Sequence, residues 1–313
     1  MLGGFIVENW KHKVLPSEDV IGFGVRRACD GKDIEIIVAA DGITRDPLIR
    51  NDWNLPDSGN FFGKMMFSMF YPRPSHAAKA AKIVCDAAIN FDYNHLNQID
   101  ENTARWVLRT SNSHIKKYQK KEVPKGDYLQ NDFPGAVAAL ALFSGEQAYW
   151  SFITDCGFAV FGKEGEVKFK TPNENPNSKG SIDEDVAKKY NTSFRESKGR
   201  KIIRSEYRNN PKNPLAYGAL TGEEFAIPYI RSGKRLLSPG DICAVYSDGV
   251  EEILFPGKKP GESYEAVAKR WAEIKEQKRM ISDFFCRQDF FGLKQYCRAN
   301  VRTEGSLVLR VGD

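Results

Sequence analysis

The chain has 313 residues, of which 46 are lysine or arginine and 41 are aspartate or glutamate, so its formal net charge is +5. Hydrophobic residues make up 41% and charged residues 28%, which excludes a disordered tail protein, a collagen-like chain and a membrane bundle. The longest nearly pure apolar run, 136–143, is far shorter than the ~20 residues that cross a bilayer. The first residues lack the features of a signal peptide, so we expect a cytoplasmic protein without membrane contact.

The cysteines and histidines do not form a metal or disulfide pattern. Six cysteines are spread along the chain without a pair of the C-x-x-C kind, whereas a zinc site or a disulfide framework needs close spacing. The four histidines are scattered, and none lies in an H-E-x-x-H arrangement. We therefore expect reduced, mostly buried thiols, as in a cytosolic protein.

The first expected elements are a β-hairpin and two helices. Residues 20–29 and 34–40 are β-prone, and the turn between them contains Asp30-Gly31. The second of these strands is almost continuously apolar, which indicates that both of its faces are covered. Ser75 and Asp100 are typical N-cap residues in front of helical patterns, so we expect a helix after each.

From residue 135 the pattern is mainly that of strands. Residues 171–200 are polar and are expected to form a surface excursion with one short helix and no second core. No repeat or linker divides the chain, so we expect one domain with helices outside antiparallel sheets. The expected strands are 136–143, 147–154, 157–162 and 166–170 in a meander, then 226–230, 242–246 and 306–311, with a helix at about 264–274.

Acidic residues stand where the expected strands begin or end. They are Glu18 and Asp19 before the first strand, Asp41 after the second, and Asp155 and Asp248 after later ones. Mg²⁺ and Mn²⁺ take oxygen ligands from a few carboxylates and keep several waters, which suits carboxylates gathered from strand ends. Asp-Gly is also an ordinary turn dipeptide, so spacing alone indicates a metal site only weakly.

The order of these motifs is more informative than any one of them. The chain reads SED before the first expected strand, AADG after the second, TDCG inside the meander, and later SPGD followed by YSDGV. This order resembles the metal-dependent protein serine/threonine phosphatases of the PPM type, also called type 2C. The resemblance covers nearly the whole chain, and its most specific part is the "PGD…SDG" element at 239–249.

The resemblance implies an α+β fold of four layers, an αββα sandwich in which two stacked antiparallel sheets are flanked by helices. It implies a single phosphatase-like domain over 1–313, with the segment at about 172–215 as a basic surface insertion or flap. The implied activity is hydrolysis of phosphoserine or phosphothreonine in a phosphoprotein by a metal-activated water, without a phosphoenzyme intermediate.

The resemblance also implies roles for particular residues. Two Mg²⁺ or Mn²⁺ ions are implied at one end of the sheets, and Asp155 matches the ligand of a third, looser ion. Asp41 and Asp19 would take part in catalysis. The implied ligands of the core site are Glu18, Asp19, Asp41, the carbonyl of Gly42 and Asp248, with help from Glu304.

The sequence departs from the family pattern in ways that bear on activity. The usual aspartate before the last strand is replaced by Thr303-Glu304, and we expect the longer Glu304 side chain to reach the metal. Ile43-Thr44 replaces a glycine pair. Two interpretations stay open, a divergent active enzyme and a catalytically weak module that binds a phosphoprotein. The enzyme is favoured because the other acidic residues are retained.

Family members also hold the phosphate with an arginine that has no obvious counterpart here. Lys11, Lys13 and Arg45 are the candidates, and Arg45 is favoured as a catalytic residue because it lies in the loop after Asp41.

The positive charge is concentrated in one stretch. Nine basic and two acidic residues lie between residues 188 and 212, a local net charge of +7 that leaves −2 for the remainder. The stretch is a solvated surface, a flap that attracts acidic phosphopeptides, or a nucleic-acid contact that uses the interleaved Tyr190, Phe194 and Tyr207. The last ranks lowest, because no RNA-binding motif or recognition helix is visible. The oligomeric state is left open.

Overall fold

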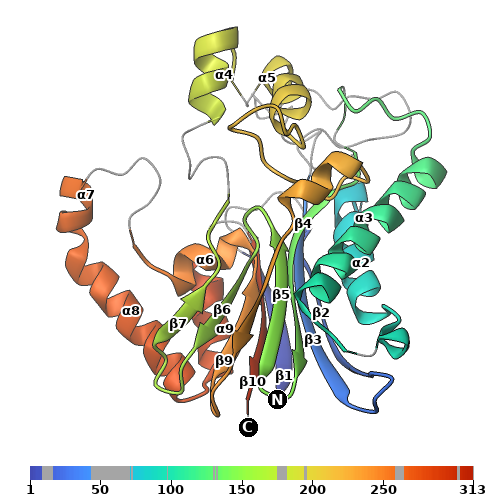
Figure 1. The fold of residues 1–313 in the computed structure, drawn as a ribbon. Coiled ribbons are helices and arrows are strands. Elements are labelled where there is room, and N and C mark those ends of the chain that lie inside the picture. Colours follow the sequence, from blue (N-terminus) through green and yellow to red (C-terminus); the bar gives the residue numbers. More distant parts are fainter. Residues whose placement is uncertain are drawn as a thin grey trace.

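The computed structural model describes residues 1–8, 17–43, 71, 73–96, 98–129, 131, 133–174, 182–193, 196–257, 264–301 and 304–312. Within them, two five-stranded antiparallel sheets lie face to face, and helices cover their outer faces (Figure 1). This confirms the four-layer α+β fold. The first sheet has the order β1 (Leu2–Glu8), β10 (Glu304–Val311), β9 (Ile242–Tyr246), β6 (Gly157–Phe161), β7 (Val167–Lys170). The second has the order β2 (Val20–Arg27), β3 (Asp33–Gly42), β4 (Ala136–Ser144), β5 (Gln147–Ile153), β8 (Arg231–Leu236).

Two helices close the outer face of the second sheet. These are α2 (His76–Ile89) and α3 (Glu101–Glu122), with the short η1 (Tyr93–His95) between them. Both predicted N-caps are confirmed, because Ser75 accepts a hydrogen bond from the first turn of α2 and Asp100 forms a capping box at the start of α3. The side of α2 that faces the sheet is rich in buried alanines, so its backbone can approach the strands closely.

Helices near the C-terminus close the outer face of the first sheet. They are α6 (Asp248–Leu254), α8 (Trp271–Cys286) and α9 (Phe290–Asn300), and α7 (Tyr264–Lys269) precedes α8. The ring of Phe161 in β6 stacks on Phe285 of α8 with the ring centroids 4.0 Å apart. A separate apolar cluster therefore fixes these helices on the sheet.

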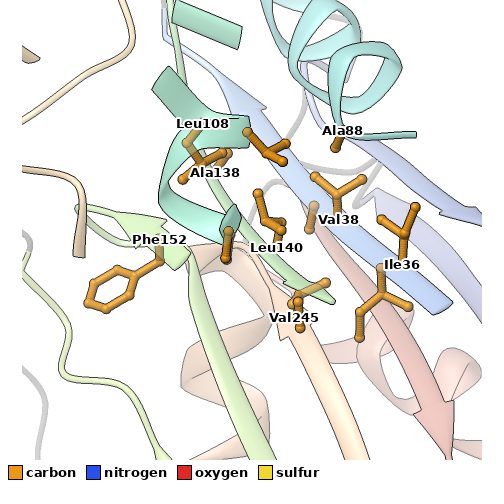
Figure 2. Close-up of a cluster of buried hydrophobic side chains, with 14 of the residues drawn as sticks. Ile36, Val38, Ala88, Leu108, Ala138, Leu140, Phe152 and Val245 are labelled. Carbon is orange, nitrogen blue, oxygen red and sulfur yellow. The ribbon is translucent and has the colours of Figure 1, made fainter. Parts of the chain in front are cut away.

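The main core lies on both sides of the second sheet. β3 and β4 are buried along almost their whole length, which explains their nearly continuous apolar sequence. Figure 2 shows members of this core from α2, α3 and both sheets: Ile36, Val38, Ala88, Leu108, Ala138, Leu140, Phe152 and Val245.

Two expectations about the strands are wrong. The chain begins with β1, which was not expected, so the strand after Glu18 and Asp19 is the second and not the first. The meander is also interrupted, because β6 pairs with β7 and β9 and not with β5. Thr154 has a φ of 67°, and the chain passes there from the second sheet to the first. The three-residue connection 154–156, expected as a turn within one meander, therefore joins different sheets.

The later elements also differ from expectation. A strand is expected at 226–230, but residues 226–229 belong to the 3₁₀ helix η4 (Glu224–Tyr229), where Pro228 has no N–H to donate to a sheet. The strand β8 begins only after this helix, at Arg231. The single helix expected at about 264–274 is divided at Arg270, whose N–H closes a turn on Val267. α6 and α9 were not expected.

The segment after β7 contains more structure than one short helix. It holds α4 (Ile182–Tyr190), α5 (Ser197–Ile202) and the π-helical turn η3 (Ile203–Tyr207). Ile182, Val186 and Tyr207 form a small buried cluster of their own, which packs this segment locally. Among the described helices, none has both the length and the apolarity of a membrane span.

Candidate metal centre

The antiparallel order of the strands brings the predicted acidic residues to one end of the molecule. Asp41 lies at the end of β3, and Asp19 immediately precedes its partner β2. Asp248 begins α6 directly after β9, and Glu304 begins the neighbouring β10. The chain termini lie at the opposite end of the sheets (Figure 1).

Glycines let the backbones carrying these residues approach closely. A Cβ at position 249 would overlap the carbonyl oxygen of Glu304, so only glycine permits this contact between α6 and β10. A Cβ at position 42 would lie 2.6 Å from the carbonyl carbon of Ala77 in the first turn of α2. The glycines after Asp41 and Asp248 are therefore required by packing, beyond any role in a turn.

Asp19 is buried, and only one of its two carboxylate oxygens accepts a hydrogen bond from the described residues. Its Oδ2 accepts a 3.0 Å hydrogen bond from the hydroxyl of Ser247, and that hydroxyl in turn accepts the backbone N–H of Ser306 at 2.9 Å. Oδ1 of Asp19 is also buried and accepts no hydrogen bond from the described residues. Burial, and then the negative charge of Glu304, raise the pKa of Asp19 to about 7.

Asp41 lies in the combined field of its acidic neighbours. Burial first, and then the charges of Asp19, Asp248, Asp155 and Glu304, raise its pKa well above the ordinary value. These four carboxylates, Asp155 included, therefore lie near enough to Asp41 for their charges to act on it. A positive charge at this position would relieve the repulsion.

Asp248 lies on the open side of the group. Its pKa is raised first because neighbouring protein atoms displace part of its hydration, and then by the negative charges of Glu251, Glu252 and Glu304. Because Asp248 is exposed at the surface, water attenuates this effect, and the larger electrostatic penalty falls on Asp19 and Asp41.

Glu304 turns toward the same group. Its Oε2 accepts a 2.9 Å hydrogen bond from the backbone N–H of Glu18, and its charge acts on Asp19, Asp41 and Asp248. Thr303, the alternative in strict register, lies outside the described residues.

Glu18 is engaged by hydroxyl groups. Its Oε1 accepts hydrogen bonds from Tyr71 and from Ser75, the N-cap of α2. Its carbonyl oxygen accepts the N–H of Gly42 at 3.2 Å. The structure thus connects Glu18 to the start of α2. No motif in the sequence marks Tyr71 as a partner of Glu18.

The sequence predicts three candidates for a phosphate-binding side chain. Arg45, Lys11 and Lys13 lie outside the described residues. Ser247, which orients Asp19, was not proposed as a site residue, although it belongs to the "SDG" element that marked Asp248.

The donor set suits a hard divalent cation. All the side chains concerned are carboxylates, and one buried oxygen of Asp19 has no hydrogen-bond donor among the described residues. Within the same part of the chain, no lysine or arginine forms an ion pair with Asp19, Asp41 or Asp248, and no group of three or more histidine, cysteine, aspartate or glutamate side chains is arranged so that it could hold a metal ion. The fit to a metal ion thus rests on the donor chemistry and on the uncompensated charge.

Comparison with solved structures identifies the fold. Two structures of a bacterial serine phosphatase, one of them an arginine-to-lysine variant, match 100% of this chain and 98% or 97% of theirs, with a TM-score of 0.51 and 11% or 12% identity. The chain has the PPM-type phosphatase fold. A further match is the catalytic domain of the serine/threonine phosphatase PstP in complex with two manganese ions, at 14% identity and a TM-score of 0.48 over 100% of this chain and 99% of that one. No protein-family model and no curated protein matches the sequence.

The basic segment is only partly a solvated surface. Arg204 and Arg208 are buried, and Arg208 donates a 3.2 Å hydrogen bond to the hydroxyl of Tyr217. Tyr207 is buried and donates to Asp185 at 2.6 Å. One of the three aromatic residues expected to stack on nucleic-acid bases is therefore turned inward.

Proposed function

We propose that the chain is a Mg²⁺- or Mn²⁺-dependent phosphoprotein phosphatase that acts on phosphoserine or phosphothreonine in the cytoplasm. The observation that carries the proposal is the gathering of Asp19, Asp41, Asp248 and Glu304 at one end of a PPM-type sandwich, where no lysine or arginine among the described residues forms an ion pair with the three aspartates. A buried carboxylate such as Asp19, and a half-buried one such as Asp41, destabilise the fold when no positive charge lies beside them, so their presence favours a function that supplies cations.

In this proposal each residue has a stated task. Asp19, Asp41 and Asp248 hold two ions, with Glu304 assisting and Asp155 available for a looser third. Ser247 fixes the orientation of Asp19 through its 3.0 Å hydrogen bond. When bound, Mg²⁺ or Mn²⁺ lowers the pKa of a coordinated water and neutralises phosphoryl oxygens.

Glu18 contributes by connecting elements. Its hydroxyl partners Tyr71 and Ser75 attach it to the N-terminus of α2, and its backbone N–H holds Glu304. The carbonyl of Gly42 and the Arg45 side chain complete the proposed site, as a ligand and as a phosphate-binding group respectively.

The test is hydrolysis of p-nitrophenyl phosphate with added Mn²⁺, compared with EDTA. Asp41→Asn removes the central charge and should abolish metal-dependent turnover. Asp86→Asn makes the same chemical change at an exposed position of α2 and should leave turnover unchanged. No turnover with Mn²⁺, or full activity of Asp41→Asn, would refute the proposed phosphatase activity.

The alternative is a catalytically weak module that binds a phosphoprotein through the same site. The engagement of Glu18 by Tyr71 and Ser75 favours it, because these hydroxyls occupy an oxygen that a metal ion would need. Calorimetric binding of a phosphoserine peptide that requires Mn²⁺, without phosphate release, would establish this alternative in place of the enzyme.

A further inference from the structure

A second group of basic residues lies at the end of α3. Between residues 116 and 125 the chain has five lysines and one glutamate, and all five lysines are exposed. Only Lys121 forms an ion pair among the described residues, with Glu122 at 3.2 Å. Lysines in the last turn of a helix offset its dipole, but Lys116, Lys117 and Lys125 lie outside that turn of α3.

The basic segment after β7 contacts the chain directly beyond these lysines. Nη2 of the buried Arg204 donates a 2.7 Å hydrogen bond to the carbonyl oxygen of Leu129, in the loop that follows α3. Farther along, Gly222 packs against the backbone of Lys116, and Asn112 of α3 accepts its N–H at 2.8 Å. Two basic stretches, connected by a contact between residues 75 positions apart in sequence, therefore lie close together.

We name the lysines of these two stretches the basic surface, and all of them are exposed except Lys201, which is half-buried. Within the described part of the chain, none of these lysines except Lys121 forms an ion pair. The basic surface comprises Lys116, Lys117, Lys120, Lys121 and Lys125 from α3 and its following loop, with Lys198, Lys201 and Lys212 from the α5 segment.

The basic surface and the carboxylate group lie at the same end of the molecule. In Figure 1, α4, α5 and the end of α3 lie at the end of the sandwich where β3 and β9 finish. Carboxylates repel a negatively charged substrate, so an anionic partner needs an attractive field nearby. Lysine side chains are flexible, so they supply such a field to partners that bind in different conformations.

We propose that the basic surface docks an acidic segment of the phosphoprotein substrate next to the candidate metal centre. This rests on the proposed function and adds to it a substrate class, phosphosites flanked by aspartate or glutamate. A nucleic acid fits less well, because base stacking needs several exposed aromatic rings. Of the aromatic residues interleaved with the basic ones, Tyr190 is exposed but Tyr207 is buried.

The experiment compares two phosphoserine peptides that differ only in their flanks, four glutamates or four glutamines. One variant combines Lys117→Glu with Lys120→Glu, and a second combines Lys198→Glu with Lys201→Glu. The control combines Lys278→Glu with Lys294→Glu, which makes the same charge change at exposed positions of α8 and α9 on the other side of the sandwich. The readouts are kcat/KM for each peptide, kcat/KM for p-nitrophenyl phosphate, and peptide binding by fluorescence anisotropy.

We expect the wild type to prefer the glutamate peptide by about tenfold, and either variant to remove most of this preference. Turnover of p-nitrophenyl phosphate should not change in either variant, and the control should behave as the wild type. The preference should also fall as salt is raised.

Equal kcat/KM for both peptides, or an equal loss in the control, would overturn the proposal. So would tighter binding of a 20-nucleotide single-stranded RNA than of the glutamate peptide, if the same variants abolish it, since the surface would then bind nucleic acid. If p-nitrophenyl phosphate is not hydrolysed at all, the proposed function fails on its own. The anisotropy comparison of the two peptides still decides the docking site, because it needs no turnover.

Discussion

The backbone N–H of Glu18 donates a 2.9 Å hydrogen bond to Oε2 of Glu304, across a sequence separation of 286 residues. This bond joins the approach to β2 in the second sheet to the first residue of β10 in the first sheet. The same carboxylate adds negative charge to Asp19 and Asp41. Glu304 therefore joins the sheets at the candidate site and also contributes to its charge.

These two contributions of Glu304 can be separated by substitution. Glu304→Gln keeps an acceptor for the Glu18 N–H and loses the charge, whereas Glu304→Ala loses both. We expect both variants to raise the Mn²⁺ concentration that gives half-maximal activity by about tenfold. Only Glu304→Ala should also lower the free energy of unfolding, by about 1–3 kcal/mol. Metal titrations and urea unfolding measure the two effects, and a normal Mn²⁺ requirement in Glu304→Gln would remove this residue from the site.

The stability of the metal-free protein should depend on pH through Asp19. Its pKa is raised from 3.8 to about 7 on folding, so the folded protein binds this proton more tightly than the unfolded chain. The resulting stability is complete below pH 3.8 and is lost as the pH rises through about 7. In EDTA, the Tm should therefore fall from pH 5 to pH 8.

Asp19→Asn isolates this effect. The variant keeps an oxygen that can accept from Ser247, so its metal-free Tm at pH 8 should exceed that of the wild type and should change less with pH. Asp86→Asn, at an exposed position, is the control. A wild-type Tm difference between pH 5 and pH 8 that Asp19→Asn leaves intact would show that other groups cause it.

Ser247 should matter for both stability and activity. Its hydroxyl accepts the N–H of Ser306 and donates to Asp19, and the residue is 1% exposed. Ser247→Ala leaves both partners buried without that bond, which should cost about 1–3 kcal/mol of unfolding free energy and reduce turnover. The exposed Ser205→Ala should change stability by less than about 0.5 kcal/mol. Equal effects of the two substitutions in urea unfolding would contradict the role given to Ser247.

Gly249 should tolerate no side chain. The added methyl of Gly249→Ala would meet the backbone of Glu304, so α6 and β10 would have to separate at an expected cost of about 1–3 kcal/mol. Asp248 and Glu304 would move with them, and metal-dependent activity should fall. Gly3→Ala is the matched control, because a Cβ there meets nothing within 4 Å. A stable and active Gly249→Ala would mean that this contact does not set the geometry of the site.

The parts of the fold that follow from local chemistry could be predicted from sequence. Ser75 and Asp100 cap helices through neighbouring backbone groups, and the Asp30-Gly31 turn joins strands that are adjacent in the chain. The carboxylates could be located because each one stands at the end of a strand, and the order of the motifs indicated the fold that places them together.

The rest depends on contacts between distant segments. The seven-residue β1 is recognisable only through its pairing with β10, and the sheet change at Thr154 depends on a backbone angle that local propensity does not favour. The same holds at the site, where Tyr71 reaches Glu18 from a distance of 53 residues. Sequence patterns report which side chains a strand end carries, but not which distant hydroxyl will meet them.

The pairing of β1 with β10 also has a consequence for biosynthesis. Leu2 lies opposite Arg310, and β10 lies between β1 and β9. A nascent chain can form the hairpin of β2 and β3 early, but the first sheet stays in two pieces until residue 311 has left the ribosome. Because such distant pairings form slowly, the half of the candidate site on β10 should assemble after translation of that strand. An incompletely translated chain would then present Asp41 without Glu304, so the candidate site would be completed only after β10 has joined the first sheet.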